Sequence, residues 1–117
     1  MMAKPAMWFD INAKDAALSR AFYKGVFGWD FNVLEPLNYG LTQTYEKIPG
    51  GIGQASEGSS HPSGVVVYFP VDDIETTLAG VEKNGGRCVV QPWELPGYGR
   101  MAVFTDPDGN RIGIWQV

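Results

Sequence analysis

The sequence predicts an α+β fold made of two βαβββ modules, whose strands form an open, barrel-like sheet that encloses a cleft. Two amphipathic helical segments each follow a strand of alternating polarity, and short apolar runs separated by turns follow each helix. The 15 glycines and eight prolines fit a chain with many turns, and 44% hydrophobic residues are enough for a core. The same order of elements occurs twice, which indicates two copies of one supersecondary unit.

The first module is expected to span about residues 6–56. Residues 6–12 have the period-two pattern of a strand. The two faces of this strand carry Met7, Phe9 and Ile11, and Trp8, Asp10 and Asn12. Asp15 begins a helix as its N-cap or as an acidic residue of its first turn, and Gly28 ends it. The apolar stripe of this helix, expected to cover one face of the strands, consists of Leu18, Ala21, Phe22 and Val26. The remaining strands are expected at residues 29–34, 39–48 and 51–55.

The second module is expected to span about residues 64–117, after a small, polar linker at residues 57–64. Residues 65–71 form a strand whose apolar face carries Val65, Val67, Phe69 and Val71. Asp72-Asp73 then opens a helix, with Asp72 and Glu75 at the spacing of a capping box. Its buried stripe is expected to consist of Ile74, Leu78 and Val81, and Asn84-Gly85 ends it. Residues 87–93 follow as a strand.

A closing hairpin follows a turn at Pro96-Gly97. Its strands flank Asp106-Pro107-Asp108-Gly109-Asn110, a segment that favours a tight turn because proline fixes φ, Asp and Asn cap backbone N–H groups and glycine accepts positive φ. This setting explains the Asp106 and Asp108 carboxylates without a catalytic role.

The repeat has a nearly constant spacing in the sequence. Three pairs are 58 residues apart: Met7 and Val65, Asp15 and Asp73, Gly28 and Gly86. Tyr39-Gly40 precedes Tyr98-Gly99 by 59 residues, and Gly53 precedes Gly113 by 60. The alternative is two βα units of similar length by chance. Together the modules would make residues 1–117 a single domain.

Charge and composition exclude several classes of function. A net charge of −4 and a pI near 4.8 argue against nucleic acid as a partner. No apolar run approaches a membrane span, and the N-terminus lacks the hydrophobic region of a signal peptide, so we expect a cytoplasmic protein without a membrane partner. Cys88 is the only cysteine, which excludes an intrachain disulfide, and we expect it to be a small buried residue of a strand.

Three stretches carry a resemblance to a known family: residues 15–31, 68–86 and 98–116. The first contains Ala-Phe-Tyr before Val-Phe-Gly-Trp, the second contains Val-Asp-Asp-Ile, and the third contains the closing hairpin. Together they resemble the vicinal oxygen chelate superfamily, which includes glyoxalase I, extradiol dioxygenases and bleomycin-resistance proteins. The resemblance implies paired βαβββ modules, a small-molecule ligand and a homodimer.

The resemblance also implies four strand positions at which metal-using members place ligands, usually His or Glu. In this sequence they hold Trp8, Gly53, Val66 and Gly113, none of which offers a donor side chain to a metal. The only histidine, His61, lies in the linker. We therefore expect no cofactor. The alternative is a Mg²⁺ or Ca²⁺ site built from water and the carboxylates of Asp10 and Glu46.

The cleft-facing positions predict an aromatic binding site instead. The expected ligand-binding residues are Trp8, Asp10, Tyr68, Arg100 and Trp115. Aromatic rings with one carboxylate suit a flat or cationic organic molecule, and Arg100 suits an anionic group at the cleft mouth. Each residue has a plainer interpretation: the rings pack in the core or a dimer, Arg100 forms a surface ion pair, and Asp10 faces solvent or pairs with Asn12 or Arg111. Residues 93–98 form either a lid or a packed turn.

Three hypotheses on function follow. The first is a metal-independent protein of the glyoxalase/bleomycin-resistance type that binds a small organic molecule. The second is a lyase, isomerase or dioxygenase of the same superfamily, using an unexpected metal site or acid–base chemistry of Asp10 or Glu46. The third is an accessory module whose aromatic faces bind a partner protein. A Ser-His-Asp triad cannot be assembled around one loop histidine, and no P-loop is present.

Overall fold

The computed structural model of the chain describes residues 7–42, 49–56 and 61–116. The chain divides into an N-terminal unit, Trp8–Val65, and a C-terminal unit, Val66–Val117 with Met1–Met7. Of the expected strand at residues 39–48, only the part up to Thr42 is described; residues 43–48, with Glu46, lie outside the described ranges, as do linker residues 57–60. None of the helices in the described ranges is long and apolar enough to cross a membrane.

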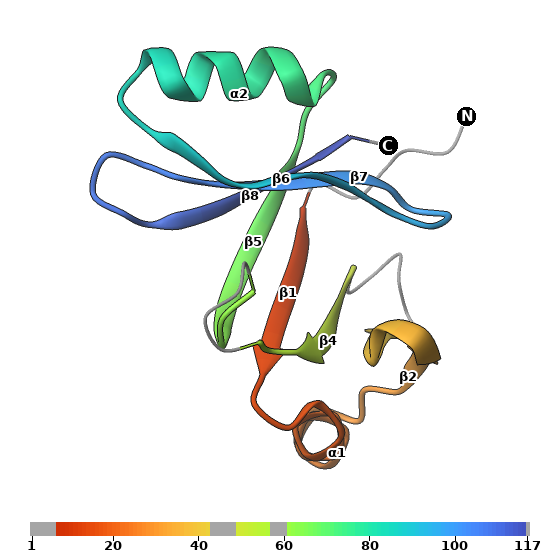
Figure 1. Cartoon of the computed structure of the whole chain (residues 1–117). Coiled ribbons are helices and arrows are strands. Elements are labelled where there is room, and N and C mark those ends of the chain that lie inside the picture. Colours follow the sequence, from red (N-terminus) through yellow and green to blue (C-terminus); the bar gives the residue numbers. More distant parts are fainter. Residues whose placement is uncertain (1–6, 43–48, 57–60, 117) are drawn as a thin grey trace. The chain divides into compact units, whose positions relative to one another are not determined.

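The N-terminal unit contains a four-stranded sheet and one α-helix (Figure 1). Its elements are β1 (Trp8–Ala13), α1 (Ala16–Phe27), β2 (Phe31–Leu34), the 3-10 helix η1 (Glu35–Leu37), β3 (Tyr39–Thr42) and β4 (Gly50–Gln54). The strand order is β2-β3-β4-β1. β1 and β4 run parallel, whereas β2, β3 and β4 form antiparallel pairs.

The C-terminal unit repeats this topology. Its elements are β5 (Gly64–Pro70, which begins at the boundary between the units), α2 (Ile74–Lys83), β6 (Arg87–Leu95), β7 (Gly99–Thr105) and β8 (Arg111–Gln116). The strand order is β5-β8-β7-β6, with β5 parallel to β8 and the other pairs antiparallel. The prediction of an α+β fold with two βαβββ modules is therefore confirmed.

Local side chains fix where the helices begin. The Asp15 carboxylate accepts a hydrogen bond from the Leu18 N–H at 3.1 Å, and Gly28 ends α1 with φ 75°. In α2 the N-cap is Asp73, whose carboxylate accepts from Glu75 N–H and Thr76 Oγ1, so the expected capping box at Asp72 is wrong by one residue. A cap must directly precede the first helical turn, and Asp73 occupies that place.

A glutamine at the end of the last strand provides a second anchor for each helix. Gln54 Oε1 accepts from the Ala16 N–H at 3.0 Å, and Gln116 Oε1 accepts from the Ile74 N–H at 2.8 Å. Ala16 and Ile74 are the first helical residues and are fully buried, so these bonds satisfy N–H groups that water does not reach. The two modules thus share this glutamine cap of the helix as well as their topology.

Strand register corrects the spacing of the repeat. Asp10 pairs with Gly51, and Tyr68 pairs with Gly113, so β1 and β5 are 58 residues apart while β4 and β8 are 62 apart. The counterpart of Gly113 is therefore Gly51 rather than Gly53. Tyr39 and Gly40 pair with Gly53 and Ile52, whereas Met101 and Ala102 pair with Trp115 and Ile114. By the same offset of 62 residues, the counterpart of Tyr39-Gly40 is therefore Met101-Ala102 and not Tyr98-Gly99. The offset grows because β6 is nine residues long, whereas β2 has four.

The two helices differ in how they meet their sheets. Ile74 of α2 is buried with Ala102 and Ile114, and Leu78 packs against this cluster, which confirms these two positions of its predicted stripe. The stripe predicted for α1 is wrong, because all four of its residues are exposed: Leu18, Ala21, Phe22 and Val26. Instead, Arg20 lies across Gly40 of β3 and donates to the Ile52 carbonyl at 3.4 Å. The helix is therefore turned so that Arg20 faces the strands and the apolar stripe faces outward.

An aromatic cluster also holds α1. The Tyr23 ring stacks on that of Trp29, with centroids 5.6 Å apart, and Trp29 contacts Phe9 of β1 at 5.7 Å. Aromatic pairs of this kind supply contact area that an ordinary apolar stripe would otherwise provide. Tyr23, which the apolar pattern of the sequence left out, is thus among the residues that attach α1 to its unit.

The first strand of each unit confirms the predicted alternation but buries the face that was expected to line a cleft. Trp8, Asp10 and Asn12 are the buried residues of β1. In β5 the buried residues are Val66 and Tyr68, whereas Val65 and Phe69, expected on the apolar face, are exposed. Cys88 lies in β6, as expected for a strand residue, but is only half-buried. Burial raises the pKa of its thiol.

The closing turn has the predicted chemistry. The Asp106 carboxylate accepts from the Asp108 N–H at 3.0 Å and from the N–H and side-chain amide of Asn110, both at 2.9 Å. The Asn110 side chain is the main reason that the pKa of Asp106 is lowered. Gly109 has φ 91°. Asp106 is therefore a structural carboxylate, as the turn motif predicted.

Candidate functional site

The N-terminal unit contains a buried carboxylate that two aromatic side chains bind. Asp10 Oδ1 accepts a hydrogen bond from the Tyr39 hydroxyl at 2.6 Å and another from Trp8 Nε1 at 3.2 Å. Trp8 Nε1 also lies 3.2 Å from the Tyr39 oxygen, so the three groups form a closed triangle. Asp10 is 6% exposed and Trp8 1% exposed. Because a buried carboxylate is costly unless it is hydrogen-bonded, this triangle explains how Asp10 is accommodated.

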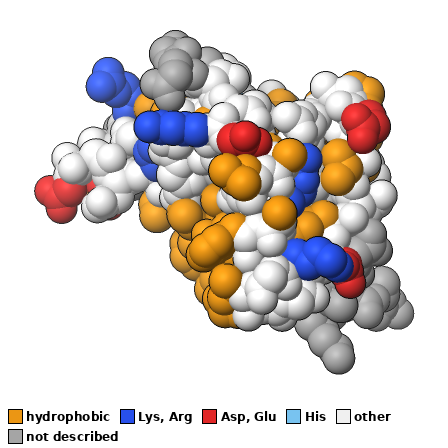
Figure 2. All heavy atoms as spheres, turned by 90° about the horizontal axis from the view of Figure 1, so that it is seen from below, with side chains coloured by type: hydrophobic (Ala, Val, Ile, Leu, Met, Phe, Trp, Pro, Cys, Tyr) orange, Lys and Arg blue, Asp and Glu red, His pale blue; other side chains and the backbone are white. Residues whose placement is uncertain are grey.

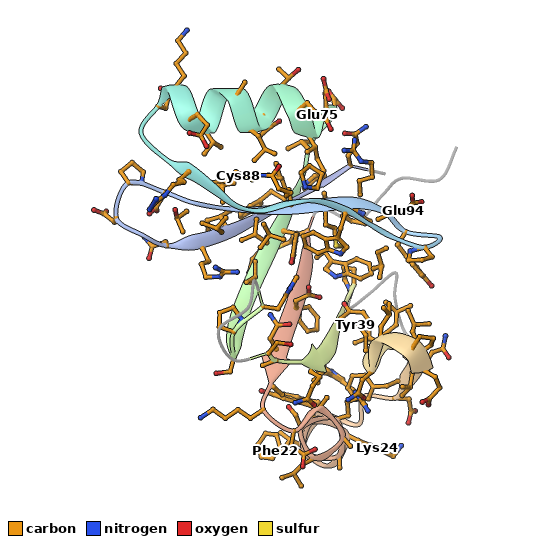
Figure 3. All side chains as sticks on the ribbon, in the orientation of Figure 1. Phe22, Lys24, Tyr39, Glu75, Cys88 and Glu94 are labelled. Atoms are coloured by element: carbon orange, nitrogen blue, oxygen red, sulfur yellow. The ribbon has the colours of Figure 1, made fainter. Side chains whose placement is uncertain are left out.

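Strand geometry and two glycines bring these groups together. Trp8 and Asp10 share one face of β1 because they are two residues apart. Tyr39 starts on β3 opposite Gly53, and its ring crosses β4 to reach Asp10, which pairs with Gly51 (Figure 3, where Tyr39 is labelled). A Cβ atom on Gly51 would come within 2.6 Å of Tyr39 Cε2, and one on Gly53 within 2.9 Å of Cδ1. Only glycine at both positions leaves room for the ring.

Tyr39 is the main residue that sequence reasoning missed. The sequence predicts that Tyr39-Gly40 starts a strand, and that Asp10 faces solvent or pairs with Asn12 or Arg111. The burial of Asp10 excludes the solvent-facing interpretation. The signal available in the sequence was Gly51 and Gly53, which alternate on one face of a short strand and so indicate that a large group approaches closely.

The C-terminal unit holds a second tyrosine ring against a glycine. Tyr68 of β5 pairs with Gly113 of β8, and a Cβ on Gly113 would lie within 2.5 Å of Cγ and Cε2 of the ring. Trp93 packs edge-on against Tyr68, with ring centroids 6.2 Å apart and an interplanar angle of 77°. Tyr68 is fully buried. The side of β8 at Gly113 is therefore covered by an aromatic ring.

Trp115 fastens the turn between β6 and β7. Its indole Nε1 donates to the Tyr98 carbonyl at 2.7 Å, and the Tyr98 N–H donates to the Leu95 carbonyl at 2.9 Å. β6 continues to Leu95, so the first half of the loop predicted at residues 93–98 is strand. The hydrogen bonds on both sides of Tyr98 match the packed-turn interpretation. Trp115 is fully buried.

Arg100 forms a two-pronged ion pair with Glu75. Figure 3 shows Glu75 at the start of α2. The Nη1 and Nη2 atoms of Arg100 lie 3.2 and 2.5 Å from the two carboxylate oxygens. The hydrogen bonds from Arg100 are the largest cause that lowers the pKa of Glu75 to about 2. This is the surface ion pair given above as the alternative for Arg100; its contact with a ligand stays a prediction.

The positions at which the resemblance implies metal ligands do not fit a divalent metal. They hold Trp8 of β1, Val66 of β5, Gly113 of β8 and, by the corrected register, Gly51 of β4. The tyrosine rings of the two units cover both glycines. In the described ranges no three His, Cys, Asp or Glu side chains gather in a way that could hold a metal ion. Glu46, part of the carboxylate alternative, lies outside those ranges.

The structure places the five predicted site residues in three settings. Trp8 and Asp10 belong to the hydrogen-bonded triangle of the N-terminal unit. Tyr68 and Trp115 are buried on neighbouring strands of the C-terminal unit, where Trp115 pairs with Pro70. Arg100 pairs with Glu75 on the surface of the same unit. His61 lies in the segment before β5, where its carbonyl accepts from the Ser56 N–H at 3.0 Å.

Two βαβββ modules with the same strand order define a class of paired-module α+β proteins. Comparison with known proteins identifies the family within that class. Residues 6–114 match the model of the glyoxalase/bleomycin resistance protein/dioxygenase superfamily. The chain belongs to this superfamily, as the resemblance predicted.

Comparison with individual proteins agrees with this assignment to the superfamily. A glyoxylase-like domain-containing protein of Didymella fabae is 33% identical, over 90% of this chain and 88% of that protein. The anthracycline biosynthesis protein DnrV of Streptomyces peucetius is 31% identical, over 93% of this chain but 46% of its own length, so the chain spans about half of that relative. The crystal structure of a superfamily member from Vibrio splendidus 12B01 has a TM-score of 0.65 at 16% identity, covering 94% of this chain and 96% of that one, which supports the fold.

Replacing Gly113 by alanine tests the contact between Tyr68 and β8. The added methyl group would collide with the ring, so we expect Gly113→Ala to lower the free energy of unfolding by about 1–3 kcal/mol in urea titrations. Gly80→Ala is the matched control, because a Cβ there meets no atom within 4 Å and alanine favours a helix by roughly 0.5–1 kcal/mol. Equal stability of Gly113→Ala and the unmodified chain would contradict the contact.

Replacing Arg100 by glutamine tests the ion pair. Because Arg100 lowers the pKa of Glu75 to about 2, Arg100→Gln should return that pKa toward its usual 4.5, as followed by NMR titration of the Glu75 carboxyl. Since the folded-state pKa is the lower one, the pair contributes stability above pH 4.5 that is lost as the pH falls toward 2. Arg87→Gln, an exposed substitution at the start of β6, should leave the Glu75 titration unchanged. An unchanged titration in Arg100→Gln would refute the pairing.

Proposed function

We propose that this chain binds a small organic molecule through aromatic side chains and does so without a metal ion. The observation that carries the proposal is the pair of tyrosine rings on glycines: Tyr39 lies on Gly51, and Tyr68 lies on Gly113. Gly113 occupies a position at which the resemblance implies a metal ligand, and Gly51 occupies another by the corrected register, in place of the predicted Gly53. A ring in each place supplies an apolar surface where a metal site would need oxygen or nitrogen donors.

The proposed ligand is planar and carries a positive charge. Aromatic rings attract flat and cationic molecules through stacking and cation–π interaction, and the Asp10 carboxylate is the matching charge partner. In the N-terminal unit the proposed ligand-binding residues are Trp8 and Asp10, and in the C-terminal unit they are Tyr68, Arg100 and Trp115. Support for this chemical class comes from DnrV, a relative named for anthracycline biosynthesis, since anthracyclines are planar polycyclic compounds that carry an amino sugar.

In this proposal the chain works in the cytoplasm as a homodimer, and neither nucleic acid nor a membrane is its partner. The acidic pI near 4.8 supports the exclusion of nucleic acid, because a polyanion would be repelled.

A lyase, isomerase or dioxygenase activity is the second candidate. The observation that favours it is the Tyr39 hydroxyl, which lies 2.6 Å from a buried carboxylate oxygen of Asp10. A hydroxyl and a carboxylate at this distance form the kind of pair that moves a proton in acid–base catalysis. The third candidate, an accessory module that binds a partner protein, draws support from the exposed apolar residues of α1.

An anthracycline and its neutral aglycone form a matched pair of probes, because they share the planar rings and differ in the amino sugar. We expect tryptophan fluorescence quenching by both, with tighter binding of the charged compound. Asp10→Asn should remove that preference, a loss of roughly tenfold in affinity. Asp108→Asn is the control, since it makes the same change of charge at an exposed turn position.

Two outcomes would contradict the proposal. If neither probe quenches the tryptophan fluorescence, the result would argue against a planar aromatic ligand. A preference for the charged compound that survives in Asp10→Asn would show that Asp10 is not its charge partner.

A further inference from the structure

Asn12 of β1 is a buried residue whose side-chain amide forms no hydrogen bond within the described part of the chain. It is 8% exposed and lies on the same face of the strand as Trp8 and Asp10. An asparagine side chain offers one acceptor oxygen and two N–H donors. By contrast, the Asp10 carboxylate on this face accepts hydrogen bonds from both Trp8 and Tyr39. Because burying an unpaired amide costs free energy, packing alone does not explain Asn12.

Strand pairing places this amide beside the Tyr39 ring. Asn12 pairs with Gly53 of β4, and Asn12 Oδ1 lies 3.9 Å from the position that a Cβ on Gly53 would take. The Cδ1 atom of Tyr39 lies 2.9 Å from the same position. Since Gly53 has no side chain, the amide and the ring approach each other from the strands on either side of β4. The amide, the ring and the Asp10 carboxylate therefore share one face of the sheet.

The helix of the unit covers the opposite face of the sheet. Arg20 of α1 lies against Gly40, which follows Tyr39 in β3, so the Tyr39 side chain points to the side of the sheet away from α1. Figure 2 views the molecule from below, the side on which α1 lies in Figure 1, and shows hydrophobic side chains gathered there. That surface is separate from the face that carries Asn12, and α1 supplies no partner for the amide.

The internal repeat shows that the topology does not require a polar residue at this position. Because β1 and β5 are 58 residues apart, the counterparts of Asp10 and Asn12 are Tyr68 and Pro70. Pro70 pairs with Trp115 of β8, and its side chain has neither a donor nor an acceptor. The carboxylate and the amide on one strand face therefore distinguish the N-terminal unit from its repeat.

We infer that Asn12 determines specificity by donating a hydrogen bond to an oxygen atom of the ligand. The inference rests on the proposed function, in which Asp10 binds the positive charge of a planar molecule. Asp10 and Asn12 are two residues apart on an extended strand, so their side chains leave the backbone about 7 Å apart. The ligand class is thereby narrowed from any planar cation to one that carries a carbonyl or hydroxyl oxygen at a similar distance from its positive charge.

Two probes that differ only in their oxygen atoms test this inference. Aminomethyl-anthraquinone and aminomethyl-anthracene, substituted at the same ring carbon, share their fused rings and their ammonium group, and only the anthraquinone carries carbonyl oxygens. We expect isothermal titration calorimetry to show that the unmodified chain binds the anthraquinone about fivefold more tightly, since the Asn12 amide adds one hydrogen bond.

The variants remove the amide and keep the charge partner. Asn12→Leu should bind both probes with equal affinity, because leucine cannot donate to a carbonyl. Asn12→Ala is a second variant that adds no volume beside the Tyr39 ring, and it should lose the same preference. Asn32→Leu is the matched control, because it makes the same change at an exposed position of β2, and it should keep the fivefold preference. Circular dichroism checks that each variant is folded.

The outcomes separate this inference from the proposed function. If the unmodified chain bound both probes equally, or if the folded Asn12 variants kept the preference, the role of Asn12 would be overturned while binding of a planar cation would stand. Loss of the preference in Asn32→Leu as well would also overturn it, because the effect would not be specific to the amide. If neither probe bound the unmodified chain, the proposed function would fail and the inference with it.

Discussion

In each unit of the chain a tyrosine ring lies against the bare backbone of a glycine on another strand. Tyr39 crosses Gly51 and Gly53 in the N-terminal unit, and Tyr68 lies on Gly113 in the C-terminal unit. Glycine is required at these positions because any Cβ would collide with the ring. These contacts have two consequences. They bring the Tyr39 hydroxyl to Asp10, and they cover the strand positions from which other residues would project side chains. The aromatic covering of one face in each sheet therefore depends on this steric constraint.

The two units build this arrangement differently from the same topology. Tyr68 stands on the first strand of its unit and pairs directly with its glycine, whereas Tyr39 stands on the third strand and reaches across β4. The shared features are the N-cap aspartates Asp15 and Asp73 and the glutamines that bind the first N–H of each helix. The helices diverge most, because α1 presents apolar residues outward where α2 presents polar ones. The two modules therefore share their topology and helix caps, but they differ in the tyrosine–glycine contact and in the outward face of the helix.

Local patterns in the sequence predicted the modules, the position of each helix and the alternation in β1 that places Trp8 beside Asp10. They failed where long-range geometry decides. The orientation of α1 depends on Arg20 reaching across Gly40, which no helical periodicity reveals. The contact of Tyr39 with Asp10 depends on the register of three strands across 29 residues. The extra length of β6 shifted the equivalence of the last strands, so that Gly51 replaced Gly53 as the counterpart of Gly113.

Metal content most directly tests the central proposal that tyrosine rings lie on glycines where a metal site would need donor side chains. The measurement is elemental analysis of protein purified without a histidine tag, followed by titration with Mn²⁺, Fe²⁺, Ni²⁺ and Zn²⁺ while the unfolding midpoint is recorded. Because a metal that binds only the folded chain must stabilise it, a site of the family type would raise the midpoint. The account predicts no stoichiometric metal and no rise with any of the four ions. Near-stoichiometric, tightly bound metal would contradict it and favour an enzyme.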